Sequence, residues 1–282
     1  MWRMTESDME FPSEIVDGIR ELHSSAKAAV QQLSAEAEEV ARTERVWADL
    51  ERFLAKGWAL HVLDLVEKEA PRLRKMRAEN NPAVPLIQKA YRLAKEESEA
   101  IVRRYPALLE EACRTAGLVL DSHSRHPRYS FDRGFFRLEI DEKKRTARLS
   151  DHEGRLAEHP ADVQAVVETV RREHQRIFGR AFNGPKFLKT LRAQYKAVLN
   201  KEQQADGASV PIRRITRRLG KNVKGFRTDE FLVDLSRLAE KGPFDIDGRR
   251  LDLQQTKDTN QGMLLLGAAA RGYIGFIVFK EV

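Results

Sequence analysis

Residues 229–251 read DEFLVDLSRLAEKGPFDIDGRRL, and this stretch decides the fold of the C-terminal region. Its first half carries apolar residues at helical spacing, and a short break at Gly242-Pro243 follows. The second half reads as strand on either side of Asp247-Gly248, a dipeptide that favours a tight hairpin turn. The stretch therefore predicts a helix with Thr228 as its N-cap, followed directly by a β-hairpin.

The neighbouring segments extend this order in both directions. Helical patterns over 186–201 and about 210–219, the second ended by Gly220, precede the quoted stretch, and a strand-like run, GYIGFIVFKEV, ends the chain. The order of three helices, a hairpin and a last strand resembles a winged helix-turn-helix domain over residues 184–282. One departure is the segment GKNVKGFRT between the two helices, which is longer than the usual turn. The resemblance implies nucleic-acid binding, with the wing touching backbone, and equally allows docking onto another protein.

The N-terminal part reads as helix from Ser13, a predicted N-cap, to Gly117, with breaks at Ala70-Pro71 and at NNPAVP. Ten positions of the first helix step by four and three residues, and eight of them are apolar. Two interpretations stay open: an amphipathic helix packed on its own domain, or a coiled coil with a second copy or another protein. The seam consists of Ile15, Ile19, Leu22, Ala26, Ala29, Leu33, Glu36, Val40, Thr43 and Trp47.

Between these parts, alternating residues predict a β-hairpin or a three-stranded meander from Tyr129 to Leu149. Pro160 is expected to open the helix that follows. The fold class predicted for the chain is mainly α with small β elements, an α+β protein. We expect a helical, partly coiled-coil arm at 1–118, a hairpin and helix region at 119–183, and a winged-helix-like domain at 184–282.

The composition is basic, with a net charge of +7 and a pI near 9.5, which favours nucleic acid, an anionic membrane surface or acidic proteins as partners. Residues 1–50 carry 5 basic and 11 acidic groups, whereas residues 51–250 carry 42 and 29. A single cysteine, Cys113, excludes a disulfide framework. The acidic N-terminus lacks an apolar segment, and no apolar run reaches membrane length, so we expect a cytoplasmic protein without a membrane partner.

The segment Pro211–Arg227 reads PIRRITRRLGKNVKGFR and holds seven Lys or Arg residues and no acid. Ile212, Ile215 and Leu219 form its inward stripe, so two pairs of arginines spaced by four crowd the outward side. Three interpretations stay open: a solvated face, a phosphate-binding surface, or a dock for an acidic protein. The predicted nucleic-acid contacts are Arg213, Arg214, Arg217, Arg218, Lys221, Lys224 and Arg227, with Arg249 and Arg250 of the hairpin.

The second helix of this region begins with acidic residues, because Asp229 and Glu230 follow Thr228. Carboxylates are repelled by phosphates, so the expected binding is dominated by backbone contacts and is weakly specific. The expected nucleic acid is DNA ahead of RNA.

Signatures of catalysis are weak. Asp121, His123 and His126 have a spacing that metals use, but they lie in a predicted loop. Strand acids followed by lysine are typical of metal-dependent nucleases, but neither candidate has the complete arrangement. These two sets are Glu139, Asp141 and Lys143, and Asp245, Asp252 and Lys257.

The sequence therefore predicts no catalytic residues, no metal and no cofactor. The predicted function is non-enzymatic nucleic-acid binding, with the arm mediating dimerisation or partner assembly. One alternative is an adaptor subunit of a larger complex, and a second is a metal-dependent nuclease.

Overall fold

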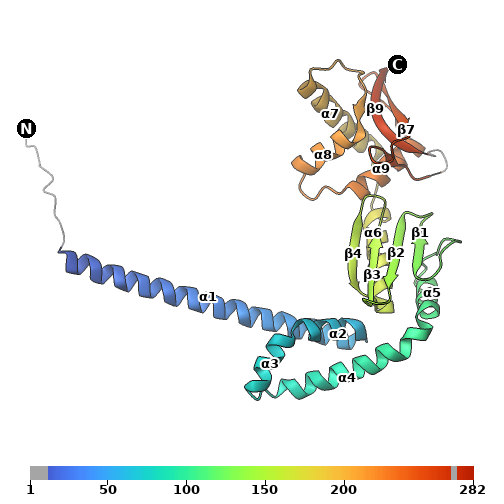
Figure 1. The fold of residues 1–282 in the computed structure, drawn as a ribbon. Helices are drawn as coiled ribbons and strands as arrows, with labels where there is room; N and C mark the ends of the chain where they lie inside the picture. Colours follow the sequence, from blue (N-terminus) through green and yellow to red (C-terminus); the bar gives the residue numbers. More distant parts are fainter. Residues whose placement is uncertain (1–11, 268–271) are drawn as a thin grey trace, which may run out of the picture. The chain divides into compact units, whose positions relative to one another are not determined.

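The structure is a computed structural model that describes residues 12–267 and 272–282 (Figure 1). It is mainly helical with two small antiparallel sheets, which confirms the α+β class. The chain forms two compact units, Met1–Glu97 and Ser98–Val282, and each is described by itself. The acidic segment 1–11 and Arg271 lie outside the described residues. The finer division at 118/119 and 183/184 stays a prediction.

The first unit is helical. Helices α1 (Ser13–Ala55), α2 (Ala59–Lys68) and α3 (Ala70–Ala78) are followed by the start of α4 (Ala83–Ile101). Gly57, with a φ of 66°, separates α1 from α2 where the sequence pattern had predicted continuous helix. Ser13 is the first helical residue and Pro12 precedes it, so the predicted Ser13 cap is wrong. The core of the unit joins α1, α2 and α4 through Leu50, Phe53, Ala59, Val62, Leu63, Ile87 and Ala94.

Helix α1 buries its apolar seam only near its C-terminal end. Every residue from 13 to 42 is exposed, including Leu22 at 68% and Val40 at 70%. Burial begins at Thr43 and is complete at Leu50. Within its own unit, α1 therefore has an apolar stripe of about seven turns that no described residue covers. Coiled-coil pairing of this stripe stays a prediction.

The second unit begins with a short 3-10 turn (Val102–Arg104) and α5 (Tyr105–Thr115), which lead into an antiparallel sheet of order β1-β2-β3-β4. The strands are β1 (Arg128–Phe131), β2 (Phe136–Asp141), β3 (Thr146–Ser150) and β4 (Arg155–Pro160). Helix α6 (Val163–Phe178) lies across one face of the sheet, where His174 and Phe178 contact the ring of Phe136 (Figure 1).

The fourth strand corrects the sequence prediction of a hairpin or three-stranded meander. Strand β4 lacks clean alternation of buried and exposed residues, so its sequence carries no period of two. Pro160 ends this strand instead of opening the next helix, and α6 begins at Val163 after Asp162. A proline fits here because it stands at the last position of an edge strand.

The C-terminal part of the second unit contains α7 (Gly184–Glu202), β5 (Val210–Pro211), α8 (Ile212–Asn222) and α9 (Thr228–Lys241). Strands β6 (Asp245–Ile246), β7 (Arg249–Thr256) and β9 (Tyr273–Glu281) complete a sheet of order β5-β9-β7-β6, with β8 (Met263–Leu264) paired to β9. Asp247 and Gly248 both have positive φ, 52° and 68°, and join β6 to β7. The predicted Asp-Gly hairpin turn is thereby confirmed.

Two boundaries in this part differ from the predictions. Val210 and Pro211 pair with β9 as a strand, so α8 begins later than expected. Gly220 lies inside α8, which continues to Asn222, because φ at Gly220 stays negative. The turn between α8 and α9 is consequently only Val223 to Arg227, five residues instead of the longer connection that the sequence indicated.

Candidate nucleic-acid interface

Helix α8 carries the predicted basic site, and its buried stripe fixes which side chains point outward. Ile212 and Ile215 are fully buried and Leu219 is 5% exposed, so the apolar side of α8 is sealed within the domain. The arginines between them must occupy the remaining faces of the helix. The local sequence therefore directs the arginines of α8 away from the core, as predicted. Their availability to a ligand depends on which of them are paired with acids.

Arg213 is held by the protein itself. Its guanidinium forms a bidentate ion pair with Glu153, which lies in the turn between β3 and β4, and also donates to the carbonyl oxygen of Gly262 at 2.8 Å. The Glu153 side chain is only 13% exposed, so this pair is well shielded from water. The expectation that Arg213 stands unneutralised is wrong, because it is engaged by an acid 60 residues away in the sequence.

The two hairpin arginines, Arg249 and Arg250, and Arg227 are also paired. Arg249 forms an ion pair with Asp206 at 3.1 Å, which also pairs with the buried Arg192, and Glu281 accepts from Arg249 at 2.6 Å. These guanidinium groups lower the pKa of Asp206, chiefly through the hydrogen bond from Arg192. Arg227 reaches Asp229 at 3.1 Å, and Arg250 lies 3.8 Å from Asp245 in an exposed, weak contact.

Arg214 forms an ion pair with Glu202 at the end of α7, but its side chain is 48% exposed. A half-exposed pair contributes little free energy, so a phosphate can compete for this guanidinium. Arg218 donates to the neutral Gln194 at 3.1 Å. Among the described residues, Arg217, Lys221 and Lys224 are exposed and have no acidic partner. We call Arg214, Arg217, Arg218, Lys221 and Lys224 the α8 cation surface.

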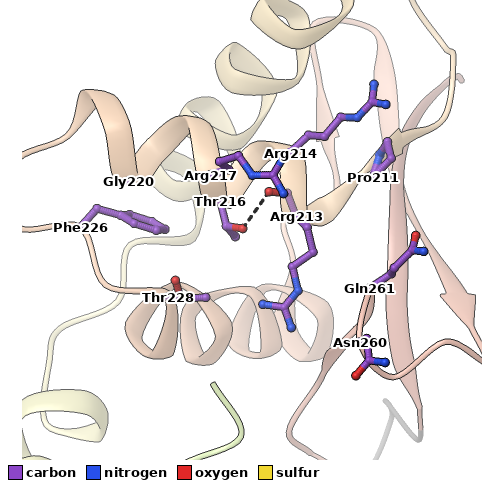
Figure 2. A pocket seen from close by; sticks show the side chains of 10 residues that line it. All are labelled: Pro211, Arg213, Arg214, Thr216, Arg217, Gly220, Phe226, Thr228, Asn260 and Gln261. Atoms are coloured by element: carbon purple, nitrogen blue, oxygen red, sulfur yellow. Dashed lines mark hydrogen bonds between the residues drawn. The ribbon is translucent and has the colours of Figure 1, made fainter. Parts of the chain in front are cut away.

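A groove of about 660 Å³ lies beside this surface, and Figure 2 shows its lining. No carboxylate is among the ten lining residues. Phe226 stands at one end, Asn260 and Gln261 stand at the other, and Arg217 and Thr216 lie between them (Figure 2). The lining residues are Pro211, Arg213, Arg214, Thr216, Arg217, Gly220, Phe226, Thr228, Asn260 and Gln261.

The acidic residues at the start of α9 pair with arginines in and just after α6. Asp229 accepts from Arg176 at 2.5 Å, and Glu230 accepts from the same guanidinium at 2.6 Å. Burial raises the pKa of Asp229, but the bonds from Arg176 and Arg227 outweigh it, so the net pKa is lowered. Arg180 pairs with Asp234 at 3.1 Å, yet burial still raises the pKa of this carboxyl. The first turns of α9 thus form an internal contact with α6.

Two of the three candidate metal ligands, Asp121 and His126, make other contacts. Asp121 accepts from the backbone amides of Arg133 and Gly134 at 3.0 and 2.7 Å, and His126 contacts Glu142 at 2.7 Å. Throughout residues 12–267 and 272–282, no group of three or more His, Cys, Asp or Glu side chains could hold a metal ion.

The candidate nuclease acids do not converge either. Glu139 lies on an exposed face of β2 and pairs with Arg128 at 3.5 Å, and Asp141 accepts from the amide of Lys144, so the Glu139–Lys143 set is divided between a strand face and a turn. Asp252 pairs with Lys280 at 2.7 Å. Asp245 lies in β6, before β7, and Lys257 follows the last residue of β7. The nuclease alternative therefore gains no geometric support in the described residues.

Sequence reasoning missed seven of the ten residues that line the groove. These are Pro211, Thr216, Gly220, Phe226, Thr228, Asn260 and Gln261. Phe226 carried a usable signal, because an aromatic residue between basic residues in a glycine-containing loop is typical of nucleic-acid binding. Asn260 and Gln261 carried none, since only the pairing of β7, β8 and β9 brings their loop beside α8.

Comparisons with protein-family models, with curated proteins and with solved structures found no match for this chain. The site is therefore interpreted from its own geometry. In the described part of the chain, none of the helices combines the length and the apolar character that crossing a membrane requires.

Proposed function

We propose that this protein binds nucleic acid without enzymatic activity, chiefly through phosphate contacts on the α8 cation surface. The observation that carries the proposal is the groove beside α8, whose lining holds no carboxylate and includes Arg217, which has no acidic partner among the described residues. Unpaired cations beside a concave, acid-free surface suit a polyanion, since each neutralised phosphate releases condensed counterions. DNA remains the expected partner ahead of RNA.

The element order supports a winged helix-turn-helix assignment for residues 184–282. Helices α7, α8 and α9, the short strand β5, and the hairpin β6–β7 packed against β9 occur in the order that this fold requires. In this assignment the hairpin is the wing. Arg250 remains at its surface with 60% exposure, whereas Arg249 is tied to Asp206 and Glu281 and has a structural role.

The acidic first turn of α9 favours contacts with the nucleic-acid backbone over recognition of bases. In a winged helix the helix after the turn is the expected reader of the major groove. Here its first turn is acidic and is held by Arg176 of α6. A helix engaged in this way offers phosphates no attraction, so α8 and its following loop are the better contact surface.

The proposal is tested by fluorescence anisotropy with labelled DNA and RNA, on the full chain. Replacement of Arg217, Lys221 and Lys224 by alanine is expected to weaken binding about 100-fold near 0.1 M salt, because three phosphate contacts are lost. A matched control replaces Lys143, Lys144 and Arg171, which are exposed elsewhere on the same unit, and changes the net charge equally. Equal losses in both variants would show only a general charge effect and would contradict the proposed site.

A second candidate function, an adaptor subunit, is favoured by α1. Its stripe from Ile15 to Val40 is apolar and exposed, which is typical of a helix that packs on another helix in an assembly. Self-association or binding of another protein through this stripe is compatible with nucleic-acid binding by α8. A function as an adaptor alone would be indicated if the wild-type protein bound neither DNA nor RNA and still assembled through α1.

A further inference from the structure

The lining of the α8 groove combines three kinds of chemistry along its length. An aromatic ring, Phe226, stands at one end, a guanidinium and a hydroxyl from Arg217 and Thr216 lie in the middle, and two primary amides stand at the other end (Figure 2). Cations and amides can both donate to phosphate oxygens, but an aromatic ring without a hydroxyl cannot. The ring of Phe226 is therefore unexplained by backbone binding alone.

Phe226 is placed by the turn between α8 and α9. Its amide donates to the carbonyl of Val223 at 3.2 Å, and Gly225 beside it has a φ of 77°, which closes a tight turn. The centroid of its ring lies 6.0 Å from the ring centroid of Phe231. Its Cδ1 atom would lie 3.7 Å from a Cβ atom placed on Gly220, so the ring also lies close to α8. Phe226 is thus supported from behind and half-buried, with part of its ring facing the groove.

The amides of Asn260 and Gln261 lie on the exposed loop between β7 and β8. Primary amides both donate and accept hydrogen bonds, so they match the edges of nucleobases. They stand at the opposite end of the groove from Phe226 (Figure 2). One base cannot therefore occupy both ends, and two neighbouring nucleotides bridged by a phosphate can.

We infer that the α8 groove takes an unpaired stretch of nucleic acid, with one base stacked on Phe226, the linking phosphate on Arg217, and the next base edge at Asn260 and Gln261. The inference rests on the proposed function and specifies its substrate as single-stranded. A base inside a duplex has both faces covered by its neighbours and cannot reach an aromatic ring in the protein. Single strands offer free faces, and stacking on aromatic side chains tolerates any sequence.

The test compares a single-stranded oligothymidylate, its RNA counterpart oligouridylate, and a hairpin duplex in anisotropy titrations on the full chain. Phe226→Leu keeps apolar bulk against Phe231 and removes the aromatic face, whereas Phe226→Trp keeps that face. We expect Phe226→Leu to weaken single-strand binding about tenfold and to leave duplex binding unchanged. Phe226→Trp is expected to retain wild-type affinity. The comparison of oligothymidylate with oligouridylate shows whether the single strand that binds is DNA or RNA.

A second variant covers the case in which Phe226→Leu lowers the melting temperature. Asn260→Ala with Gln261→Ala changes two exposed side chains and is expected to weaken single-strand binding alone. If both variants affect duplex and single strand equally, or affect neither, the inference is overturned. The proposed function survives that result provided that Arg217→Ala still weakens binding. It fails, and the inference with it, if wild-type protein binds none of the three probes.

Discussion

Helices α1 and α8 are both amphipathic, and the side that each leaves exposed is opposite in character. In α8 the apolar stripe is sealed, with Ile212 and Ile215 fully buried, and the cationic side remains at the surface. In α1 the apolar stripe is itself exposed, with Leu33 at 64% and Val40 at 70%. A surface that a fold leaves unsatisfied indicates what binds there, so the two helices indicate two different kinds of partner.

Helix α9 shows a third outcome, in which charges are satisfied inside the fold. Its first turn carries Asp229 and Glu230, and both pair with Arg176 of α6, while Arg180, which follows α6, pairs with Asp234. Charge in the sequence is therefore a poor guide to charge at the surface. The difference between α8 and α9 lies in partners that are more than 50 residues away.

The largest expected effect concerns the α1 stripe. Leu22→Lys with Leu33→Lys places two charges in the exposed seam and is expected to abolish assembly through α1, because burying unpaired charge is costly. Mass measurement by light scattering during gel filtration should then give a single-chain mass. Ser24→Lys with Gln31→Lys adds the same charge on another face of the helix and is expected to leave the assembly intact. Unchanged mass in the seam variant would remove α1 as an interface.

The next effect concerns the closure of α9 by α6. Among the described residues, Arg176→Ala leaves the buried Asp229 with Arg227 as its one cationic partner, and it is expected to lower the free energy of unfolding by about 3 kcal/mol. Arg172→Ala is the matched control, because Arg172 lies on the same helix with 66% exposure and should change stability by less than about 0.5 kcal/mol. Urea unfolding measures both. Equal, small changes would mean that the start of α9 is not held by α6.

A smaller effect is expected in the pH dependence of stability. The pKa of Asp229 is lowered in the folded protein from its ordinary value of 3.8, so its ionised form stabilises the fold above that pH. This contribution is lost as the pH falls through the folded-state pKa. The difference in unfolding free energy between wild type and Asp229→Asn should therefore be greatest near neutral pH and shrink in acid. A difference that stays constant down to acidic pH would show that the carboxylate is not the stabilising form.

The sequence predicted those features that depend on neighbouring residues. The helix at Thr228, the Asp247-Gly248 turn and the inward stripe of α8 follow from spacing and turn chemistry, and all three are present. The predicted Thr228 cap is wrong, because Thr228 is the first helical residue and Arg227 occupies the N-cap position without a side-chain hydrogen bond. Strand β4 was missed because RLAEHP lacks a period of two and ends in a proline that also suits a helix start. Glu153, in the turn before β4, pairs with Arg213. Because the sequence did not predict this turn, it also did not predict that Arg213 is neutralised.

The remaining errors in the site have the same physical origin. Glu202 ends α7 and Asp206 lies in the connection after it, and these two acids pair with Arg214 and Arg249. Such pairs depend on how separate elements pack, and neither periodicity nor composition records that packing. What remained readable was the local excess of cations, of which Arg217, Lys221 and Lys224 keep their charge unpaired in the described residues.

The salt dependence of nucleic-acid affinity tests the central claim most directly. If the five residues of the α8 cation surface each neutralise one phosphate, the slope of log K against log salt concentration, measured with duplex DNA, should be about −4.5 for wild type. Replacement of Arg217, Lys221 and Lys224 by alanine should reduce the slope to about −1.8, since three contacts are lost. A wild-type slope near zero, or one that the replacement leaves unchanged, would contradict the assignment of α8 as the surface that binds nucleic acid.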